Sequence, residues 1–108
     1  MKISIGADHA GFSVKEKIRE YLESKGYRIL DKGAYSEESV DYPEFGHAVG
    51  NSVKDGESAK GIVVCGSGIG ISMAANKVEG IRAALCMTPE HALMSRLHND
   101  ANVLAIGA

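Results

Sequence analysis

A cysteine followed by alternating glycines is the part of this sequence best suited to chemistry. Residues 61–65 form a short apolar run with β-branched side chains, which predicts a buried parallel strand ending at Cys65. Glycines at positions 66, 68 and 70 follow, before a predicted helix. Such a loop can turn several backbone N–H groups into one concavity that favours negative charge. A thiol at its edge should ionise more easily than a free cysteine. The stretch therefore predicts a base or nucleophile beside an anion-binding loop.

Other glycine-loop chemistries do not fit the spacing. A dinucleotide fingerprint requires a third glycine three residues after Gly68, where the sequence has Ile71. A cysteine phosphatase loop requires arginine six residues after Cys65, which is again Ile71. A P-loop requires a lysine that is absent from this stretch. No His, Cys or acidic residues show the spacing of metal ligands, so we expect no metal site.

Alternating strand and helix patterns must position this loop. Strands are expected near residues 2–6, 27–30, 61–65, 81–86 and 102–106, and helices near residues 12–25, 45–56, 71–77 and 88–97. The last helix has Thr88 as its predicted N-cap and Pro89 at its first position. This alternation predicts an α/β fold of three layers, α/β/α, around a five-stranded parallel, Rossmann-like sheet. A chain of 108 residues forms one domain, residues 1–108.

The predicted sheet brings two polar groups to one edge. Asp8 and His9 follow the first strand, as Cys65 follows the third, and ligands of such sheets bind beyond the carboxyl ends of the strands. His98 follows the last helix, which runs back over roughly 15 Å to the opposite edge. We therefore expect His98 to reach the pocket of a neighbouring subunit in a symmetric dimer.

Each of these residues also has a purely structural interpretation. A cysteine such as Cys65, taken alone, is often a small buried apolar residue, and we expect this of Cys86. Asp8 can be a turn or capping residue. His98 can be a cation at a helix C-terminus. Tyr42 begins a Tyr-Pro pair that predicts the start of a helix, with the ring as a pocket lid.

Composition excludes several partners. The formal net charge of −2 gives no reason to expect nucleic acid, and no apolar run reaches membrane-spanning length. Two cysteines without CxxC spacing suit reduced thiols in the cytoplasm.

Five short motifs carry a resemblance that covers the whole length of the sequence. They are Ala7-Asp8-His9-Ala10-Gly11, Asp41-Tyr42-Pro43, Cys65-Gly66-Ser67-Gly68-Ile69-Gly70, Ala74-Ala75-Asn76-Lys77 and His98-Asn99-Asp100-Ala101-Asn102. In this order they resemble the type B ribose-5-phosphate isomerases of the ribose/galactose isomerase family. The resemblance implies interconversion of D-ribose 5-phosphate and D-ribulose 5-phosphate in the pentose phosphate pathway, through an enediolate and without metal or organic cofactor.

The resemblance also implies roles for individual residues. It makes Cys65 the base and His98 the acid–base group that opens the furanose ring. The implied substrate-binding positions are Asp8, His9, Tyr42, Gly66, Ser67, Gly68, Ile69, Gly70 and Asn99. It further implies a homodimer or tetramer whose active sites are shared between subunits.

One departure from the family concerns the phosphate. Family members continue with a C-terminal helical segment and arginines that grip the phosphate, whereas this sequence stops at Ala108. We therefore expect a single isomerase domain that lacks this segment, with His9 and the glycine loop as its remaining phosphate contacts. Two alternatives stay open. One is an isomerase of galactose 6-phosphate or allose 6-phosphate, against which Cys65 favours the ribose activity. The other is a non-catalytic module that binds sugar phosphates.

Overall fold

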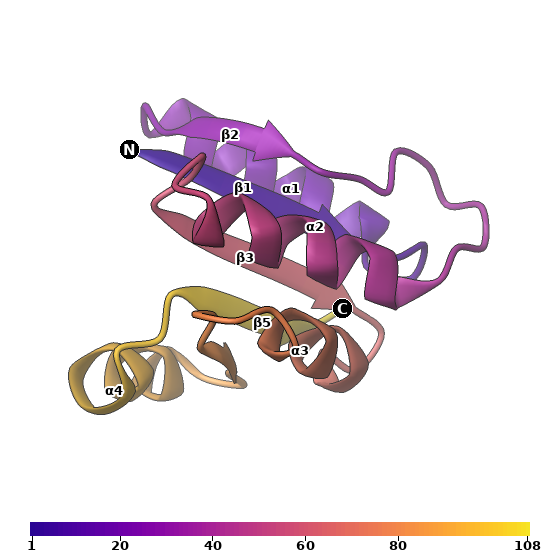
Figure 1. The fold of residues 1–108 in the computed structure, drawn as a ribbon. Helices are drawn as coiled ribbons and strands as arrows, with labels where there is room; N and C mark the ends of the chain where they lie inside the picture. The colour runs from indigo at the N-terminus through magenta and orange to yellow at the C-terminus, as the bar shows by residue number, and fades with distance from the viewer.

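A computed structural model describes residues 1–108 and shows five strands alternating with four helices (Figure 1). In chain order the elements are β1 (Lys2–Ala7), α1 (Phe12–Ser24), β2 (Arg28–Asp31), α2 (Tyr42–Lys54), β3 (Lys60–Cys65), α3 (Ile69–Asn76), β4 (Ala83–Leu85), α4 (Pro89–Asn99) and β5 (Val103–Gly107). The predicted fold class is confirmed.

All strands are parallel and lie in the order β2-β1-β3-β5-β4. The register places Ile5 beside Ile62 and Val63 beside Ala105, so β1, β3 and β5 form the middle of the sheet. After β1 the chain moves towards one edge of the sheet, and after β3 it moves towards the other. The direction therefore reverses between β1 and β3, where doubly wound sheets bind their ligands.

Helices cover the sheet on two sides. In Figure 1, α2 lies in front of β1 and β3, and α1 lies behind them. α2 packs side by side with α3, and a Cβ atom added to Gly46 would lie only 2.8 Å from Cβ of Ala74. This glycine thus permits the two helices to approach closely. The buried apolar cluster beneath them contains Ala34, Phe45, Val49, Val63, Cys65, Ile71, Ala75, Ile81, Val103 and Ala105.

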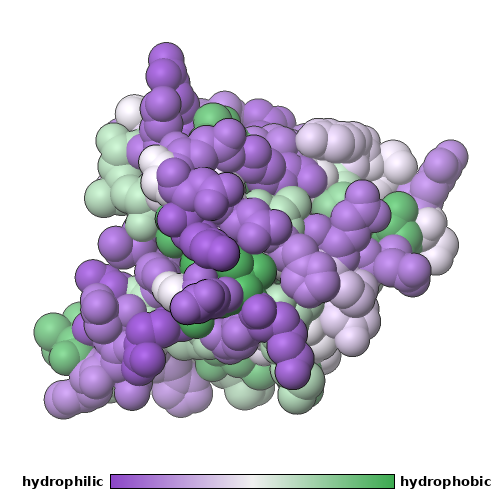
Figure 2. Space-filling view, in the orientation of Figure 1, coloured by the Kyte–Doolittle hydropathy of each residue, from purple (hydrophilic) through white to green (hydrophobic).

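Helix α4 is the least embedded element. None of its residues is buried, and the side chains of Leu93 and Leu97 are 55% and 67% exposed. The face drawn in Figure 2 is largely hydrophilic, and apolar residues gather in a hollow near its centre and at the end formed by α4. None of the four helices combines the length and the apolar character that a membrane span requires.

Helix boundaries differ from the sequence predictions at the site. Helix α2 begins at Tyr42, as the Tyr42-Pro43 pair predicts and three residues before residue 45, where its apolar stripe begins, because Pro43 suits the first helical turn, where its missing N–H costs nothing. Helix α3 begins at Ile69 instead of residue 71, after Gly68 adopts the left-handed conformation with φ 79°. The predicted cap of α4 is confirmed, since the side chain of Thr88 accepts a hydrogen bond from the N–H of His91.

Candidate active site

The loops that follow β1 and β3 meet at one edge of the sheet. The N–H of Asp8 donates to the carbonyl oxygen of Val64 at 3.2 Å. Gly66 lies against Ala10, since a Cβ atom added to Gly66 would be 3.7 Å from Cβ of Ala10. The two predicted groups of polar residues therefore share the edge at the topological switch point.

Cys65 ends β3 with its sulfur against the glycine loop. The N–H of Gly68 donates to Sγ of Cys65 at 3.1 Å, while the residue as a whole is only 5% exposed. Cys65 also belongs to the buried apolar cluster. Its sulfur is thus shielded from bulk water and accepts a hydrogen bond from a backbone N–H at the start of a helix.

The glycine loop leaves backbone donors free. No hydrogen bond within the chain uses the N–H groups of Gly66, Ser67 or Gly70, as expected for groups at the start of a helix. Oγ of Ser67 accepts the N–H of Ile69 at 3.1 Å and keeps its own hydrogen for another acceptor. Free donors at the start of a helix, such as these beside Cys65, are the arrangement that favours an anion.

Gly68 is required by its surroundings as well as by its conformation. A Cβ atom at this position would lie 2.6 Å from Cδ1 of Leu85 and 2.7 Å from the backbone carbon of Ile106. The loop is therefore held against β5, and its amides have little freedom to move. A cavity of about 570 Å³ opens beside this loop, lined partly by Ser67, Ile69 and Cys86.

Asp8 and His9 have different partners. Asp8 is 8% exposed, and its Oδ1 accepts the N–H of Gly11 at 2.9 Å, so it is the turn residue that fixes the start of α1. Nδ1 of His9 lies 3.1 Å from the backbone nitrogen of Val40 and 3.2 Å from its oxygen. When Val40 N–H donates to Nδ1, the proton of a neutral ring sits on Nε2, which is then a donor for a ligand.

Tyr42 lies over the glycine loop. A Cβ atom added to Gly70 would be 2.9 Å from Cε1 and Cζ of the Tyr42 ring, although Tyr42 itself is 41% exposed. The ring therefore forms a wall of the site at the first turn of α3.

His98 and Asn99 lie elsewhere. They form the C-terminal end of α4, where the carbonyl oxygen of Asn99 accepts a hydrogen bond from Nε of Arg82 just before β4. This is the edge of the sheet opposite Cys65, so one subunit does not bring His98 and Cys65 together. His98 lies within α4, whereas the sequence predicted that the helix ends before it.

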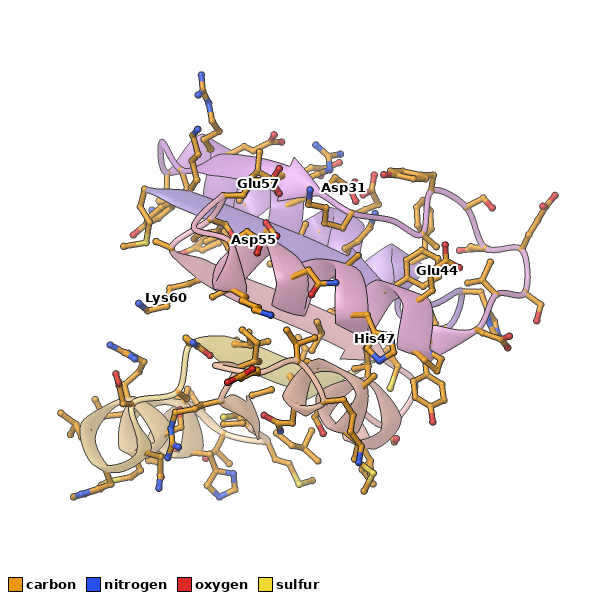
Figure 3. The ribbon with its side chains drawn as sticks, viewed as in Figure 1. Asp31, Glu44, His47, Asp55, Glu57 and Lys60 are labelled. Atoms are coloured by element: carbon orange, nitrogen blue, oxygen red, sulfur yellow. The ribbon has the colours of Figure 1, made fainter.

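The sequence predictions missed two charged side chains, one near the end of β1 and the other at the opposite edge of the sheet. Lys15 is fully buried and bonded to Asp31, and Arg82 holds the end of α4. A signal for Lys15 exists in the sequence, because it lies three residues from Phe12 and from Ile18 on the apolar stripe of α1. His47, by contrast, is exposed on α2 as expected for a surface residue (Figure 3).

A family model described as Ribose/Galactose Isomerase matches residues 3–108. The chain belongs to the ribose/galactose isomerase family. Ribose-5-phosphate isomerase B of Escherichia coli is 49% identical over 107 residues, which cover 99% of this chain and 72% of that protein. Galactose-6-phosphate isomerase subunit LacB of Clostridium acetobutylicum is 47% identical over 107 residues, which cover 99% of this chain and 62% of that subunit.

Solved structures of the family agree with the fold. Ribose-5-phosphate isomerase B of Clostridium thermocellum matches with a TM-score of 0.98 and 56% identity, over 99% of this chain and 72% of that one. The Thermotoga maritima enzyme matches with a TM-score of 0.95 and 50% identity, over 97% of this chain and 72% of that one. This ribose/galactose isomerase is thus an α/β sugar-phosphate isomerase, and its substrate is a small sugar phosphate.

Proposed function

We propose that this ribose/galactose isomerase interconverts D-ribose 5-phosphate and D-ribulose 5-phosphate. The observation that carries the proposal is the sulfur of Cys65 beside the free amides of the glycine loop, at the switch point of the sheet. The high identity to ribose-5-phosphate isomerases B supports the choice of substrate.

The chemistry is a proton transfer between neighbouring carbons. The thiolate of Cys65 removes the proton from C2 of the open-chain aldose, and the electron pair forms a C1=C2 double bond while O1 becomes an oxyanion. A proton then passes from O2 to O1, and the thiol returns its proton to C1, which leaves the ketone at C2. Free N–H groups of Gly66, Ser67 and Gly70 would stabilise the oxyanion where its charge develops.

Other residues bind and prepare the substrate. His9 would donate from Nε2 to a hydroxyl or the phosphate, and Tyr42 would close the pocket over the sugar. We propose that His98 opens the furanose ring as an acid–base catalyst and that Asn99 binds the sugar. Because both lie at the opposite edge of their own sheet, we propose that they serve the site of a second subunit in a homodimer.

Mixed subunits test the shared site. Cys65→Ala and His98→Asn variants are each expected to be inactive, and a statistical mixture of the two should recover about a quarter of the wild-type activity, since each mixed dimer keeps one intact site. Mixed dimers without activity would count against the shared site.

Both cysteines are free, which suits the cytoplasm as the proposed location.

A hexose phosphate is the second candidate substrate, because the LacB subunit is nearly as similar as the ribose-5-phosphate isomerase. Assays with ribose 5-phosphate and galactose 6-phosphate at equal concentrations decide between them. The proposal requires a higher kcat/KM for the ribose ester. Tight binding of ribose 5-phosphate without any turnover would instead identify a sugar-phosphate-binding module.

A further inference from the structure

The ammonium group of Lys15 is completely buried at the back of the candidate site. Its Nζ donates to Oδ1 and Oδ2 of Asp31 at 2.7 and 2.9 Å and to the carbonyl oxygen of Ala34 at 2.6 Å. The three hydrogens of the ammonium group thus have three acceptors. The rings of Phe12 and Tyr35 lie 5.2 and 5.5 Å from Nζ and add cation–π contacts.

Packing alone does not explain a charge at this position. Lys15 occupies the apolar stripe of α1, where a leucine or methionine would fill the space without the cost of removing a charge from water. Buried ion pairs give little net stability compared with apolar residues of similar volume. What they do supply is a fixed geometry for the groups that they join, which here are α1 and the segment after β2.

That segment leads directly into the site. Asp31 also accepts the N–H of Gly33 at 2.9 Å through Oδ1. Gly33 and Ala34 then run along the end of β1, where the N–H of Ala7 donates to Gly33 at 2.7 Å and the N–H of Ala34 donates to Ala7 at 2.6 Å. Ala7 is the residue before Asp8. Lys15 is therefore connected through Ala34 and Ala7 to the loop after β1.

The far end of the same segment touches the site again. The backbone N–H of Val40 donates to Nδ1 of His9, and two residues later the ring of Tyr42 lies over Gly70. The segment 32–41 is therefore held by Lys15 at its start, and its end contacts His9 through Val40 and leads directly into Tyr42. Figure 3 shows Asp31 where β2 passes into this segment.

We propose that Lys15 is a positioning residue of the isomerase, which sets the places of His9 and Tyr42 by fixing the segment 32–41. The inference rests on the proposed function for its kinetic effect, but the contact that it concerns is a property of the chain itself. Lys15 does not touch the reacting atoms, so its loss should weaken substrate binding and leave the proton transfer at Cys65 intact.

The experiment compares Lys15→Met with Lys17→Met, which removes an exposed lysine two residues along the same helix. Lys15→Met should raise KM for ribose 5-phosphate about tenfold and change kcat less than about threefold, since binding contacts are lost equally in the ground and transition states. It should also shift the imidazole ¹⁵N resonances of His9, which report the bond between Nδ1 and Val40. Lys17→Met should change neither KM nor the His9 resonances.

A purely structural role predicts another result. If Lys15→Met lowers only the melting temperature, with KM and the His9 resonances as in the wild type, the proposal is overturned. Asp31→Asn provides a milder second variant in case Lys15→Met does not fold, because the amide keeps an oxygen for Lys15. This variant should raise KM and shift the His9 resonances in the same direction, and unchanged values would equally reject the proposal.

The two proposals fail in different ways. A wild-type chain that does not isomerise ribose 5-phosphate contradicts the proposed function. The His9 resonances of the variants still decide whether Lys15 sets the position of that ring.

Discussion

The backbone N–H of Gly68 donates a hydrogen bond to the sulfur of Cys65 across 3.1 Å. This contact joins the end of β3 to the first turn of α3 and directs the thiol towards the loop that carries the free amides. A side chain whose sulfur accepts such a donor differs from an ordinary buried cysteine, which behaves as a small apolar residue. If the thiol acts as a base, its loss can be measured as slower hydrogen exchange at C1 of the sugar phosphate.

Cys65→Ala should abolish exchange of the C1 hydrogen of ribulose 5-phosphate in D₂O. Ribulose 5-phosphate has its O5 esterified and stays open-chain, so exchange at C1 requires only the base and the oxyanion donors. Removal of a general base costs about 10²- to 10⁴-fold in rate. The exchange is followed by proton NMR of the ketose.

Cys86→Ala is the matched control for this prediction. Cys86 is also buried, at 7% exposure, but its Sγ donates to the carbonyl oxygen of Ala84 at 3.6 Å and accepts no backbone N–H. This variant should exchange C1 hydrogen at the wild-type rate. Equal rates in Cys65→Ala and wild type would remove the thiol from the mechanism.

Gly68→Ala should be more destabilising than Gly56→Ala. Both glycines have positive φ, 79° and 78°, so alanine suffers a similar backbone strain of about 1–2 kcal/mol at each position. Only Gly68 is enclosed, because an added Cβ would contact Leu85 and Ile106, whereas nothing lies within 4 Å of that position at Gly56. Overpacking should add about 1–3 kcal/mol to the loss at Gly68.

Urea denaturation of the two variants measures this difference. Gly68→Ala should also reduce C1 exchange, because the helix start that it belongs to carries the proposed oxyanion donors, while Gly56→Ala should leave the exchange rate unchanged. Equal destabilisation by the two substitutions would show that the contacts around Gly68 relax without cost.

The layers of the fold and the edge that holds Cys65 follow from local patterns in the sequence. Apolar runs of strand length alternate with helical spacing, and the carboxyl ends of parallel strands must meet at one edge. The order of the strands does not follow, because β5 lies between β3 and β4 through contacts between residues far apart in the chain. The reversal between β1 and β3 is visible only in that order.

Long-range contacts also explain why local patterns did not predict the ion pair of Lys15 or the start of α3. The place of Lys15 on the apolar stripe of α1 indicates that it is buried, but its partner Asp31 lies 16 residues away at the end of β2. The early start of α3 depends on Gly68 packing against β5, which no local pattern contains. The position of His98 at a helix end was predictable from local spacing, whereas its place in the site of a second subunit stays a proposal.

Glu57→Gln should make the stability of the chain less dependent on acid pH. Hydrogen bonds from Lys32 and then from Ser52 lower the pKa of Glu57 from its ordinary value of 4.5. A carboxylate with a lowered pKa adds stability above the pKa of the unfolded chain and loses it as pH falls through the folded pKa. Melting temperatures measured between about pH 6 and pH 3 should therefore fall more steeply for the wild type than for Glu57→Gln.

Glu37→Gln serves as the control for the acid prediction, since Glu37 is exposed in the segment after β2 and makes no ion pair. Its melting curve should follow that of the wild type at every pH. Parallel curves for wild type and Glu57→Gln would mean that Lys32 and Ser52 do not distinguish the charged carboxylate from the neutral one.

Arg82→Met should impair the ring opening that we propose for His98 without impairing proton transfer. Nε of Arg82 donates to the carbonyl oxygen of Asn99, the residue after His98, and α4 has no buried side chain that anchors this end in the core. Turnover of ribose 5-phosphate, which is mostly a closed ring, should fall about tenfold, within the contribution of a displaced acid–base group. Exchange of the C1 hydrogen of open-chain ribulose 5-phosphate should stay at the wild-type rate.

The comparison of the two assays separates positioning from general loss of structure. Arg28→Met is the control, because this arginine is exposed at the start of β2 and should change neither assay. A variant whose fold is damaged loses turnover and exchange together, since Cys65 and the glycine loop are affected with everything else. If Arg82→Met lowers both rates by the same factor, the bond to Asn99 stabilises the domain as a whole and does not act through His98.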